Sequence, residues 1–430
     1  MKNIFKNLNS TEKALFSSSF FHGLGVETAY FVGITGYAAY NLHATPSLIA
    51  TIMVCVNIAQ ILGSSVSGMC IDKWGPQKIV GAAALVTVGV SLCSLLIGTN
   101  VKAFIAFAAV LGFLLSTSKT SYNAYAPYVE EGTSGLKRIN ALVMFGSYSS
   151  AIFGPTLGGF IVKYYPTMTV FLFTAVAVFI SFVVVLFAKE QYTPPKEEEP
   201  KHPLREATEG VRLVFAQPSL RYYLVVGIML WFSFGAFDAL ESLYYKDIVH
   251  ASIQWMGWIN GAIGVGMVVG VVALSKFPSR YINSVLLAIF VGFEGIGSIV
   301  YVATHSVYVV MLGGFLLGLA FGVAEPMMRT LIQADSPLAS VGRVLGAIQT
   351  FRVGFTIIPL MLAPSLAKIF GIQQVLIGAS VLTVILSFTL VPLARSVDKS
   401  LADKRLIYAI DPLGEGEDVS PHDRVSPSHD

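Results

Sequence analysis

The sequence predicts an all-α membrane protein with twelve transmembrane helices arranged as two six-helix pseudo-repeats. Three observations lead to this fold class. Hydrophobic residues make up 54% of the 430 residues and charged residues only 12%, long apolar runs recur along the chain, and one polar segment divides these runs into two groups of six. A spanning helix needs about 20 mainly apolar residues. Because the runs are continuous rather than alternating, they fit helices and not the strands of a barrel.

Each apolar run corresponds to one predicted span. The first group comprises residues 14–40, 47–70, 79–99, 102–127, 139–163 and 168–188. The second group comprises residues 222–245, 253–274, 282–303, 306–332, 341–367 and 372–394. The chain therefore divides into an N-terminal bundle (1–188), a linker (189–221), a C-terminal bundle (222–395) and a tail (396–430) whose Pro, Gly and acidic residues indicate disorder. Within the linker, the apolar spacing of residues 204–215 is typical of an interfacial helix.

The basic residues predict the orientation of the chain in the membrane. Of the 28 Lys and Arg residues, three lie within spans and 21 lie on the side that carries both chain ends and the linker. Only four lie on the opposite side, namely Lys102, Lys163, Lys246 and Lys368. The positive-inside rule then places both termini in the cytoplasm, as expected for a multi-pass protein of the inner (cytoplasmic) membrane.

The composition argues against several other classes of protein. A formal net charge of +3 is too small, and too localised at the span ends, to favour a nucleic-acid partner. The three cysteines, Cys55, Cys70 and Cys93, lie in or beside apolar segments, which favours small buried hydrophobes over a disulfide framework. The chain contains no phosphate-cradling loop and no metal-ligand spacing of His, Cys and acids. We therefore expect no enzymatic activity, no cofactor and no metal site.

The two groups of spans resemble each other in sequence. The stretch LKRINAL (136–142) joins the fourth and fifth spans, and VGRVLGA (341–347) joins the tenth and eleventh. Arg138 and Arg343 correspond at an offset of 205 residues, and a helix containing a proline follows each of them, with Pro155 in one and Pro359 in the other. Such weak internal symmetry is expected when two parallel six-helix repeats enclose a central site.

A charged turn between the second and third spans, GMCIDKWGPQK, carries the most specific motif. Its fixed points are Gly68, Asp72, Lys73, Gly75 and Lys78. With these residues the chain resembles the major facilitator superfamily, and the resemblance covers nearly all of residues 10–395. It implies a secondary transporter that works by alternating access and uses this motif as a conformational latch. In that latch, Gly68 would let two helices approach closely and Asp72 would face a helix N-terminus or a basic partner. The alternative is a positive-inside turn with a helix cap.

The fifth span contains GSYSSAIFGPTLGG (146–159), which is similar to the motif characteristic of the antiporters of this superfamily. The matching residues are Gly154, Pro155, Gly158 and Gly159, while Ser150 stands where the motif usually has another glycine. The motif implies export of a substrate in exchange for protons. Small residues four apart also allow close helix packing, so packing alone is the alternative explanation.

A looser resemblance concerns the substrate. SYNAYAPYV (121–129) followed by RINAL (138–142) is similar to the branch that contains macrolide efflux proteins and the enterobactin exporter. It implies an amphipathic or cationic organic substrate, either drug-like or siderophore-like. Two alternatives remain within the same fold, an uptake symporter and a lipid flippase. A third, from a different class, is a membrane receptor or scaffold that transports nothing.

Ionisable residues inside the spans are the candidates for the working site, because a charge in lipid is costly. Glu27 lies 13 residues into the first span, so at 1.5 Å per residue it is about 20 Å deep, near the midplane. It is the first candidate for a carboxylate that couples to protons or binds a substrate cation, and a glutamate facing the surface is the alternative. Asp238 and Glu241 share one face of the seventh span, with Phe234 and Phe237 four residues before each. Acids mixed with aromatics suit a cationic substrate, and solvation at the outer mouth is the alternative.

The remaining intramembrane charges lie in the fourth, ninth, tenth and eleventh spans, and Glu294 is the single charge of the ninth. Glu325 and Arg329 are four residues apart, so we expect them to form a structural ion pair. Arg352 is a single charge, and Lys119 is a candidate partner for Glu27 across a cavity.

One position departs from the family pattern. Antiporters of this superfamily usually carry an arginine in the fourth span, four residues before a glycine, but here Ala108 precedes Gly112. Proton coupling would then depend on Glu27 or Asp238. The expected partners are a small organic substrate, protons and membrane lipids, and the chain is expected to act as a monomer.

Overall fold

The computed structural model describes residues 8–130, 133–190, 203–277, 281–336 and 341–410. Every regular element within these ranges is helical. The elements of the first half are α1 (Ser10–Thr28), η1 (Ala29–Ile34), η2 (Tyr37–Asn41), α2 (Pro46–Trp74), α3 (Pro76–Cys93), η3 (Ser94–Leu96), α4 (Val101–Asn123), η4 (Ala126–Tyr128), α5 (Thr133–Tyr164) and α6 (Thr169–Val185). The elements η1 and η2 are π-helical continuations of α1.

A short helix precedes the six long helices of the second half. The elements are α7 (Pro203–Ala216), α8 (Pro218–Leu243), η5 (Tyr244–Ile248), α9 (Gln254–Lys276), α10 (Ser284–Val302), α11 (Val307–Asp335), α12 (Val341–Phe370) and α13 (Ile372–Ile410). The predicted helix at 204–215 is α7, which packs against α12 and α8.

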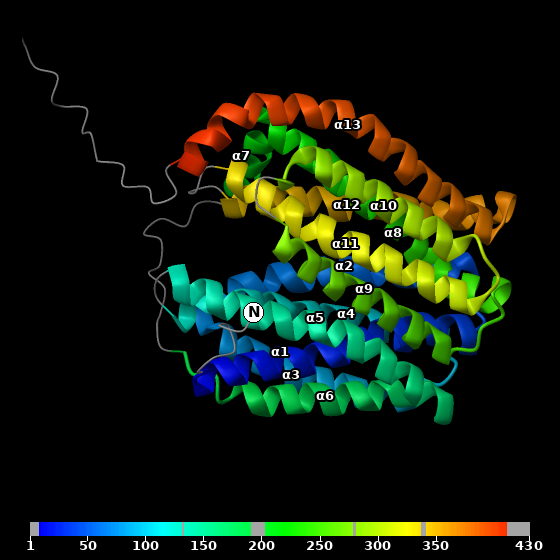
Figure 1. Ribbon diagram of the computed structural model, residues 1–430. Helices are drawn as coiled ribbons and strands as arrows, with labels where there is room; N and C mark the ends of the chain where they lie inside the picture. The colour runs from blue at the N-terminus through cyan, green and yellow to red at the C-terminus, as the bar shows by residue number, and fades with distance from the viewer. Residues whose placement is uncertain (1–7, 131–132, 191–202, 278–280, 337–340, 411–430) are drawn as a thin grey trace, which may run out of the picture.

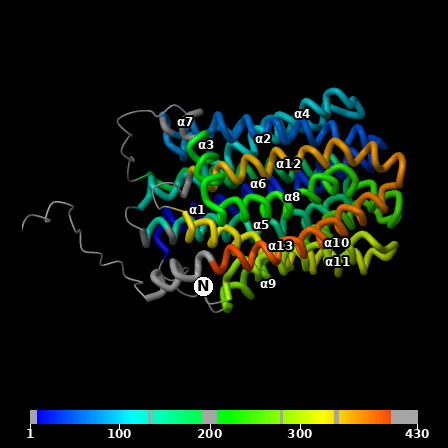
Figure 2. Tube along the Cα trace, turned by 90° about the horizontal axis from the view of Figure 1, so that it is seen from above, coloured from blue at the N-terminus to red at the C-terminus, as the bar shows by residue number. Residues whose placement is uncertain are grey.

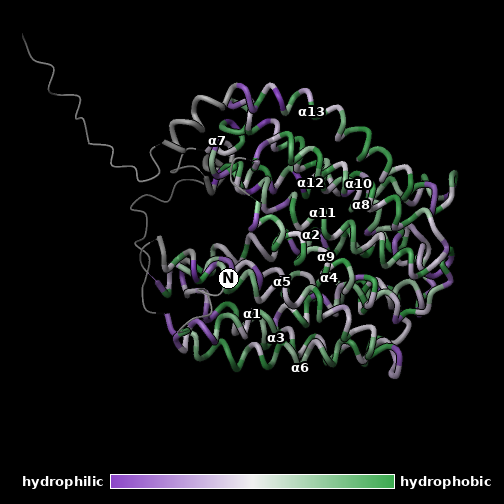
Figure 3. The backbone as a smooth tube through the Cα atoms, in the orientation of Figure 1, coloured by the Kyte–Doolittle hydropathy of each residue, from purple (hydrophilic) through white to green (hydrophobic). Residues whose placement is uncertain are grey.

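The twelve predicted spans correspond to the twelve long helices of the described ranges. Nine of these helices are both long and apolar enough to cross a membrane, and α6 is a shorter apolar helix. The other two, α1 and α5, contain more polar side chains. Figure 3 shows hydrophobic residues along the middle of the helices, with hydrophilic residues gathered mainly toward their ends.

The predicted boundary of the tail is wrong, because α13 continues to Ile410 whereas we expected disorder from residue 396. The apolar run ends near residue 394, but the sequence that follows is rich in Leu, Ala, Lys and Arg, which are good helix formers. The helix therefore outlasts the span. The rest of the predicted tail, 411–430, lies outside the described residues.

Local sequence signals fix where several helices begin. Proline occupies the first position of α2, α3 and α8, where its missing N–H has no helical partner to lose. Asn9 and Glu12 form a capping box at the start of α1, and Asn100 and Asn283 cap α4 and α10. Such caps satisfy backbone N–H groups that the helix leaves unpaired.

The two halves lie side by side and meet through a few helices (Figures 1 and 2). In Figure 1, α8 and α10–α13 form the upper part and α1 and α3–α6 the lower part, with α2 and α9 between them. The halves meet where α5 packs along α9 and where α2 packs against α8 and α12. We use "linker end" for the end of the bundle where α1 begins and α13 ends, and "closed end" for the end that carries η2 and η5.

Among the described residues, the buried apolar cluster that takes residues from both halves lies at one end of the bundle. At the closed end a single cluster takes residues from both halves, including Ile52 of α2, Leu240 of α8 and Leu360 of α12. Toward the linker end, one cluster belongs to the second half and another to the first half. The described structure is therefore sealed at the closed end, and each half has its own core at the linker end.

The backbone of the closed end supports the internal repeat. After α1, Leu42 N bonds to Tyr37 O at 3.0 Å, and after α8, Val249 N bonds to Tyr244 O at 3.0 Å. The next residue in each half is a histidine with positive φ, His43 at 47° and His250 at 53°. These pairs share an offset of 207 residues, close to the 205 read from the two arginines.

Candidate functional site

The charged turn between α2 and α3 is built on Gly75. This residue has φ 80° and ψ 158°, a conformation that is accessible essentially only to glycine. Glu190, which follows α6, accepts a hydrogen bond from Gln77 N at 2.8 Å, and a Cβ atom on Gly75 would lie 2.6 Å from a carboxylate oxygen of Glu190. A carboxylate at a helix N-terminus is electrostatically favourable. Glu190, which the sequence analysis did not single out, therefore caps α3.

In the part of the chain that the structure describes, Gly68, Lys73 and Lys78 make no close packing contact that matches the expected latch. A Cβ atom on Gly68 would meet nothing within 4 Å among the described residues, so the expected close helix contact at Gly68 is wrong for this conformation. Lys73 and Lys78 are exposed, and the side chain of Asp72 lies outside the described set. At the linker end the described residues of the two halves form separate cores.

Gly75 and Gly68 make a matched pair for a stability experiment. Gly75→Ala should destabilise the protein by about 1–3 kcal/mol, the cost of a strained backbone conformation. Gly68→Ala should leave stability unchanged or raise it by up to ~1 kcal/mol, because Gly68 lies inside a helix with space beside it. Thermal unfolding of the detergent-solubilised variants measures both effects. Equal losses in the two variants would contradict the contrast between the positions.

The glycines of the antiporter motif contact two different neighbours of α5. A Cβ atom on Gly154 would lie 2.8 Å from Cβ of Glu27, and one on Gly158 would lie 2.9 Å from Cγ2 of Val32, both in the α1–η1 segment. A Cβ atom on Gly159 would lie 2.6 Å from the carbonyl oxygen of Gln254 in α9. The motif thus packs α5 against the first helix of its own half and against α9 of the other half.

Two further motif positions belong to the same contacts. Pro155 lies inside α5, and its carbonyl oxygen occupies the place that a side chain on Gly257 of α9 would need. Ser150 is fully buried, and its Oγ fills the space beside Gly23 of α1. At this position the glycine is on α1 and the larger residue on α5, so the two helices still approach closely.

Glu27 and Lys119 lie near each other without forming an ion pair within the described ranges. Lys119 of α4 is exposed on its helix and interacts electrostatically with both Glu27 and His22. His22 is 4% exposed, and its ring lies 5.4 Å from that of Tyr122. Lys119 was a candidate partner for Glu27 from the sequence, and the ion pairs of the described residues do not include this pair.

Asp238 and Glu241 lie between the halves, where both side chains are partly buried. Tyr30 Oη of η1 donates a hydrogen bond to Asp238 Oδ1 at 3.2 Å, which links the two halves. Tyr301 Oη of α10 donates to Glu241 Oε1 at 2.5 Å and is also hydrogen-bonded to Tyr245 Oη.

A small cavity lies beside the two carboxylates, between the halves. It is lined by Tyr30, Phe31, Thr35, Phe237, Asp238, Glu241 and Ser242. It leaves about 10 Å³ for the centre of a water molecule, which is room for about one water. Phe237 accompanies the acids as expected, but Phe234 packs elsewhere, against Trp231 and Phe321.

Hydrogen bonds that link η2 to η5 and to Ala251 beyond it join the halves at the closed end. Lys246 Nζ donates to Ala39 O at 2.8 Å and lies 3.2 Å from His43 Nδ1. Tyr40 Oη donates to Ala251 O at 2.7 Å. The sequence analysis counted Lys246 only as an outer charge. Nothing in a single sequence signals that its partner is a backbone carbonyl of the other half.

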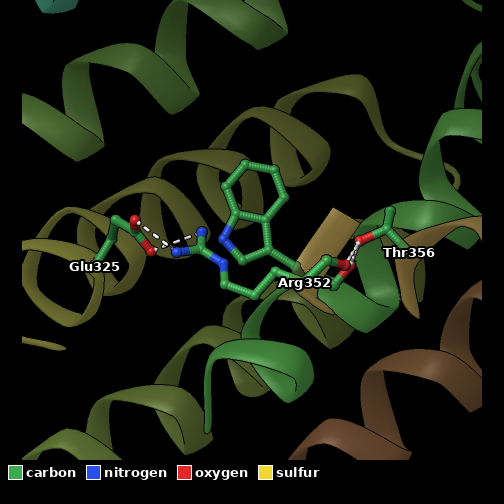
Figure 4. Close-up of polar contacts among 4 residues, drawn as sticks. Glu325, Arg352 and Thr356 are labelled. Carbon is green, nitrogen blue, oxygen red and sulfur yellow. Dashed lines mark hydrogen bonds and ion pairs between the residues drawn. The ribbon is translucent and has the colours of Figure 1, made fainter. Parts of the chain in front are cut away.

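The expected pairing of Glu325 with Arg329 is wrong, because Glu325 pairs with Arg352 of α12. The contact is bidentate, with Arg352 Nη1 at 3.1 Å from Oε1 and Nη2 at 3.0 Å from Oε2 (Figure 4). Arg329 is exposed on α11. A planar guanidinium that meets both carboxylate oxygens forms a stronger contact than a pair along one helix.

Comparison with known proteins identifies the family. The profile described as "Major Facilitator Superfamily" matches residues 15–359. The chain belongs to this superfamily.

Relatives within the superfamily cover most of the chain. "Multidrug resistance protein MdtG" of Serratia proteamaculans is 28% identical over 360 residues, covering 79% of this chain and 80% of that protein. MdtG of Salmonella typhi is 26% identical over 349 residues, covering 77% and 80%. "Uncharacterized MFS-type transporter YfiS" of Bacillus subtilis is 22% identical over 422 residues, covering 94% and 96%.

Solved structures agree on the fold. The nucleoside transporter NupG superposes with a TM-score of 0.72 at 14% identity, covering 89% of this chain and 99% of that chain. A POT family transporter in complex with 5-aminolevulinic acid gives 0.73 at 12% identity, covering 91% and 98%. The predicted fold class and family are thus confirmed. This member of the major facilitator superfamily is a multi-pass membrane transporter and not an enzyme.

Proposed function

We propose that this transporter exports an amphipathic or cationic organic molecule in exchange for protons across the inner (cytoplasmic) membrane. One observation carries the proposal. Glu27, the carboxylate nearest mid-depth in α1, packs directly on Gly154 of the antiporter motif, where a Cβ atom on the glycine would lie 2.8 Å from Cβ of Glu27. A change in the charge of Glu27 therefore acts on the contact that holds α1 against α5.

The charge of Glu27 also acts on Lys119 of α4. Ionised Glu27 attracts Lys119 of α4, and protonated Glu27 does not, so proton binding alters the force between α1 and α4. Interactions between charges at membrane depth are weakly screened. Proton uptake and the arrangement of these two helices are in this way coupled through a single residue.

Asp238 and Glu241 supply a second place for positive charge, between the halves. Two adjacent carboxylates between the halves are costly when both are ionised. In the described conformation their cavity has room for about one water, so a proton is their partner there, and a substrate cation would bind only after the halves separate. Phe31 and Phe237 line the same cavity, and aromatic rings attract organic cations. The name of the MdtG relatives, multidrug resistance protein, agrees with a substrate of this kind.

Alternating access would then proceed by rocking of the halves about the contact between α5 and α9. If both termini lie in the cytoplasm, as we propose, the closed end faces the outside, where the Lys246 and Tyr40 contacts join the halves. The exposed face around Gly68 is the surface that the opposite conformation would cover.

The test is proton movement in proteoliposomes that carry an imposed proton gradient, after addition of lipophilic cations, macrolides or siderophore-like compounds. We expect wild-type protein to move protons when a substrate is added, and we expect Glu27→Gln to lose at least 90% of that response, the scale of loss typical of an essential proton-transfer group. Asp247→Asn, an exposed acid at the closed end, is the matched control and should behave as wild type. Undiminished coupling in Glu27→Gln would remove the assignment. Folded wild type that responds to no compound would favour lipid flipping or uptake.

A further inference from the structure

The second half contains a cluster of one acid, one cation and three aromatic rings that the proposed coupling scheme does not use. Glu325 of α11 and Arg352 of α12 form the bidentate ion pair described above, with side chains 15% and 6% exposed. The guanidinium carbon of Arg352 lies 4.9 Å from the ring centre of Trp231 in α8. Arg352 is therefore held by a carboxylate on one side and by an indole face on another.

Trp231 belongs to an aromatic wall. Its ring centre lies 5.4 Å from that of Phe234 and 5.6 Å from that of Phe321, and the two phenylalanine rings are 5.5 Å apart. A carboxylate beside aromatic faces is the combination that binds organic cations, through charge and through the ring quadrupole. These groups compose a cation site that is already filled by an arginine.

We propose that Arg352 is a built-in occupant of an organic-cation subsite formed by Glu325 and Trp231, and that a cationic substrate binds there by displacing it. This inference rests on the proposed function, since it assumes an organic cation as substrate. Arg352 thereby sets specificity: a cation that can replace both its ion pair and its ring contact gains the site, whereas a small inorganic cation replaces only the ion pair.

The hydrogen bonding of Arg352 is consistent with an occupant that can leave. Its Nε and the Nε1 of Trp231 are buried, and neither has a hydrogen-bond partner among the described residues. A guanidinium has five donors, and the two Nη contacts to Glu325 satisfy only part of them. Releasing Arg352 to a wetter position gives these donors water, while an incoming cation keeps Glu325 neutralised.

Thr356 connects the backbone at Arg352 with that at Trp231. Thr356 Oγ1 donates to Arg352 O at 2.9 Å (Figure 4) and lies 3.4 Å from Trp231 O, so it ties α12 to α8. Gly227 of α8 leaves room for the side-chain stem, since a Cβ atom there would lie 3.1 Å from Arg352 Cδ.

Arg329 and Glu325, both on α11, interact electrostatically with Tyr148 of α5 in the other half. Because the halves have separate cores at the linker end, a substrate entering from that end meets this face of the second half. Displacement of Arg352 would then accompany binding in the described conformation.

Equilibrium dialysis of tetraphenylphosphonium against detergent-purified protein tests the inference. Arg352→Gln should bind this cation about tenfold more tightly than wild type, equivalent to about 1.4 kcal/mol, because the competitor is gone and Glu325 is free. The double variant Arg352→Gln/Glu325→Gln should lose that gain. Arg212→Gln, an exposed arginine of α7, is the matched control and should bind as wild type.

A second variant covers the case in which Arg352→Gln does not fold because Glu325 is left unpaired. Arg352→Lys keeps the charge but lacks the planar fork and its stacking, so it should bind the cation about threefold more tightly than wild type. Unchanged or weaker binding in either folded variant would overturn the inference. So would a loss of tetraphenylborate binding in Arg352→Gln without a gain for the cation, since that result would make Arg352 part of an anion site.

Failure of this inference and failure of the proposed function give different results. If wild type moves protons on substrate addition but Arg352→Gln gains no affinity for the cation, the proposed export function is supported and the displacement of Arg352 by substrate is not. If Arg352→Gln gains affinity while wild type transports no compound, the cation subsite stands and proton-coupled export does not. The dialysis uses no proton gradient, so the two measurements are independent.

Discussion

Valine at Gly257 is expected to reduce substrate-driven proton movement at least tenfold, and this is the largest effect that the structure predicts for a residue far from any charge. A side chain at Gly257 of α9 would collide with the carbonyl oxygen of Pro155 and with the backbone of Gly159 in α5. Overpacking of this kind costs about 1–3 kcal/mol. Backbone atoms cannot yield as a flexible side chain does, so α5 and α9 must separate.

The reason that transport suffers more than folding lies in where these helices are. The contact between α5 and α9 joins the two halves, and rocking of the halves requires that both conformations keep it. The valine side chain would disturb a contact on which the rocking motion depends, whereas most of the packing within each half would stay intact.

Proteoliposome transport together with the recovery of folded protein measures this prediction. Gly378→Val is the matched control, because Gly378 lies in α13 and a Cβ atom there would meet nothing within 4 Å among the described residues. Gly257→Ala should fall between wild type and Gly257→Val. If folded Gly257→Val transported as well as wild type, the rocking of the halves would not depend on the contact between α5 and α9.

The sequence was sufficient for the fold because the signals of membrane helices are long and redundant. An apolar run of about 20 residues predicts a span whatever its neighbours are, and prolines and asparagines mark several of the starts. The end of α13 was misplaced because apolar content reports where a span ends and not where a helix ends. The π-helical segments η1 and η2 carry no sequence signal that we recognised.

The sequence could indicate which residues are candidates for the site, but not which residues they contact. The depth of Glu27 and the shared face of Asp238 and Glu241 follow from helix geometry. The rotation of each helix about its axis is poorly fixed when every face is apolar, so sequence spacing favoured Arg329 for Glu325 while the actual partner, Arg352, comes from the next helix. For the same reason Glu190, Lys246 and Gly257 were missed, since each acts on backbone atoms of a distant segment.

Asparagine at Asp238 is expected to reduce substrate-driven proton movement at least tenfold while leaving the protein folded. Asp238 and Glu241 line one enclosed cavity, and Asp238 accepts a hydrogen bond from Tyr30 of the other half at 3.2 Å. Asparagine keeps the size and the acceptor oxygen but never carries a charge. One carboxylate alone then has neither the repulsion that favours proton binding by the pair nor the double charge that attracts a cation.

Tyr30→Phe separates the charge of Asp238 from its hydrogen bond. It removes the bond between the halves and keeps both carboxylates, so it should weaken closure by about 0.5–1.5 kcal/mol, the net value of one hydrogen bond. That corresponds to a change in transport of less than about tenfold. Both variants are compared with wild type in the same proteoliposome assay. If Tyr30→Phe lost as much proton movement as Asp238→Asn, the hydrogen bond and not the charge of Asp238 would be required for transport. If Asp238→Asn kept full coupling, another residue would carry the proton, and Glu27 is the remaining candidate.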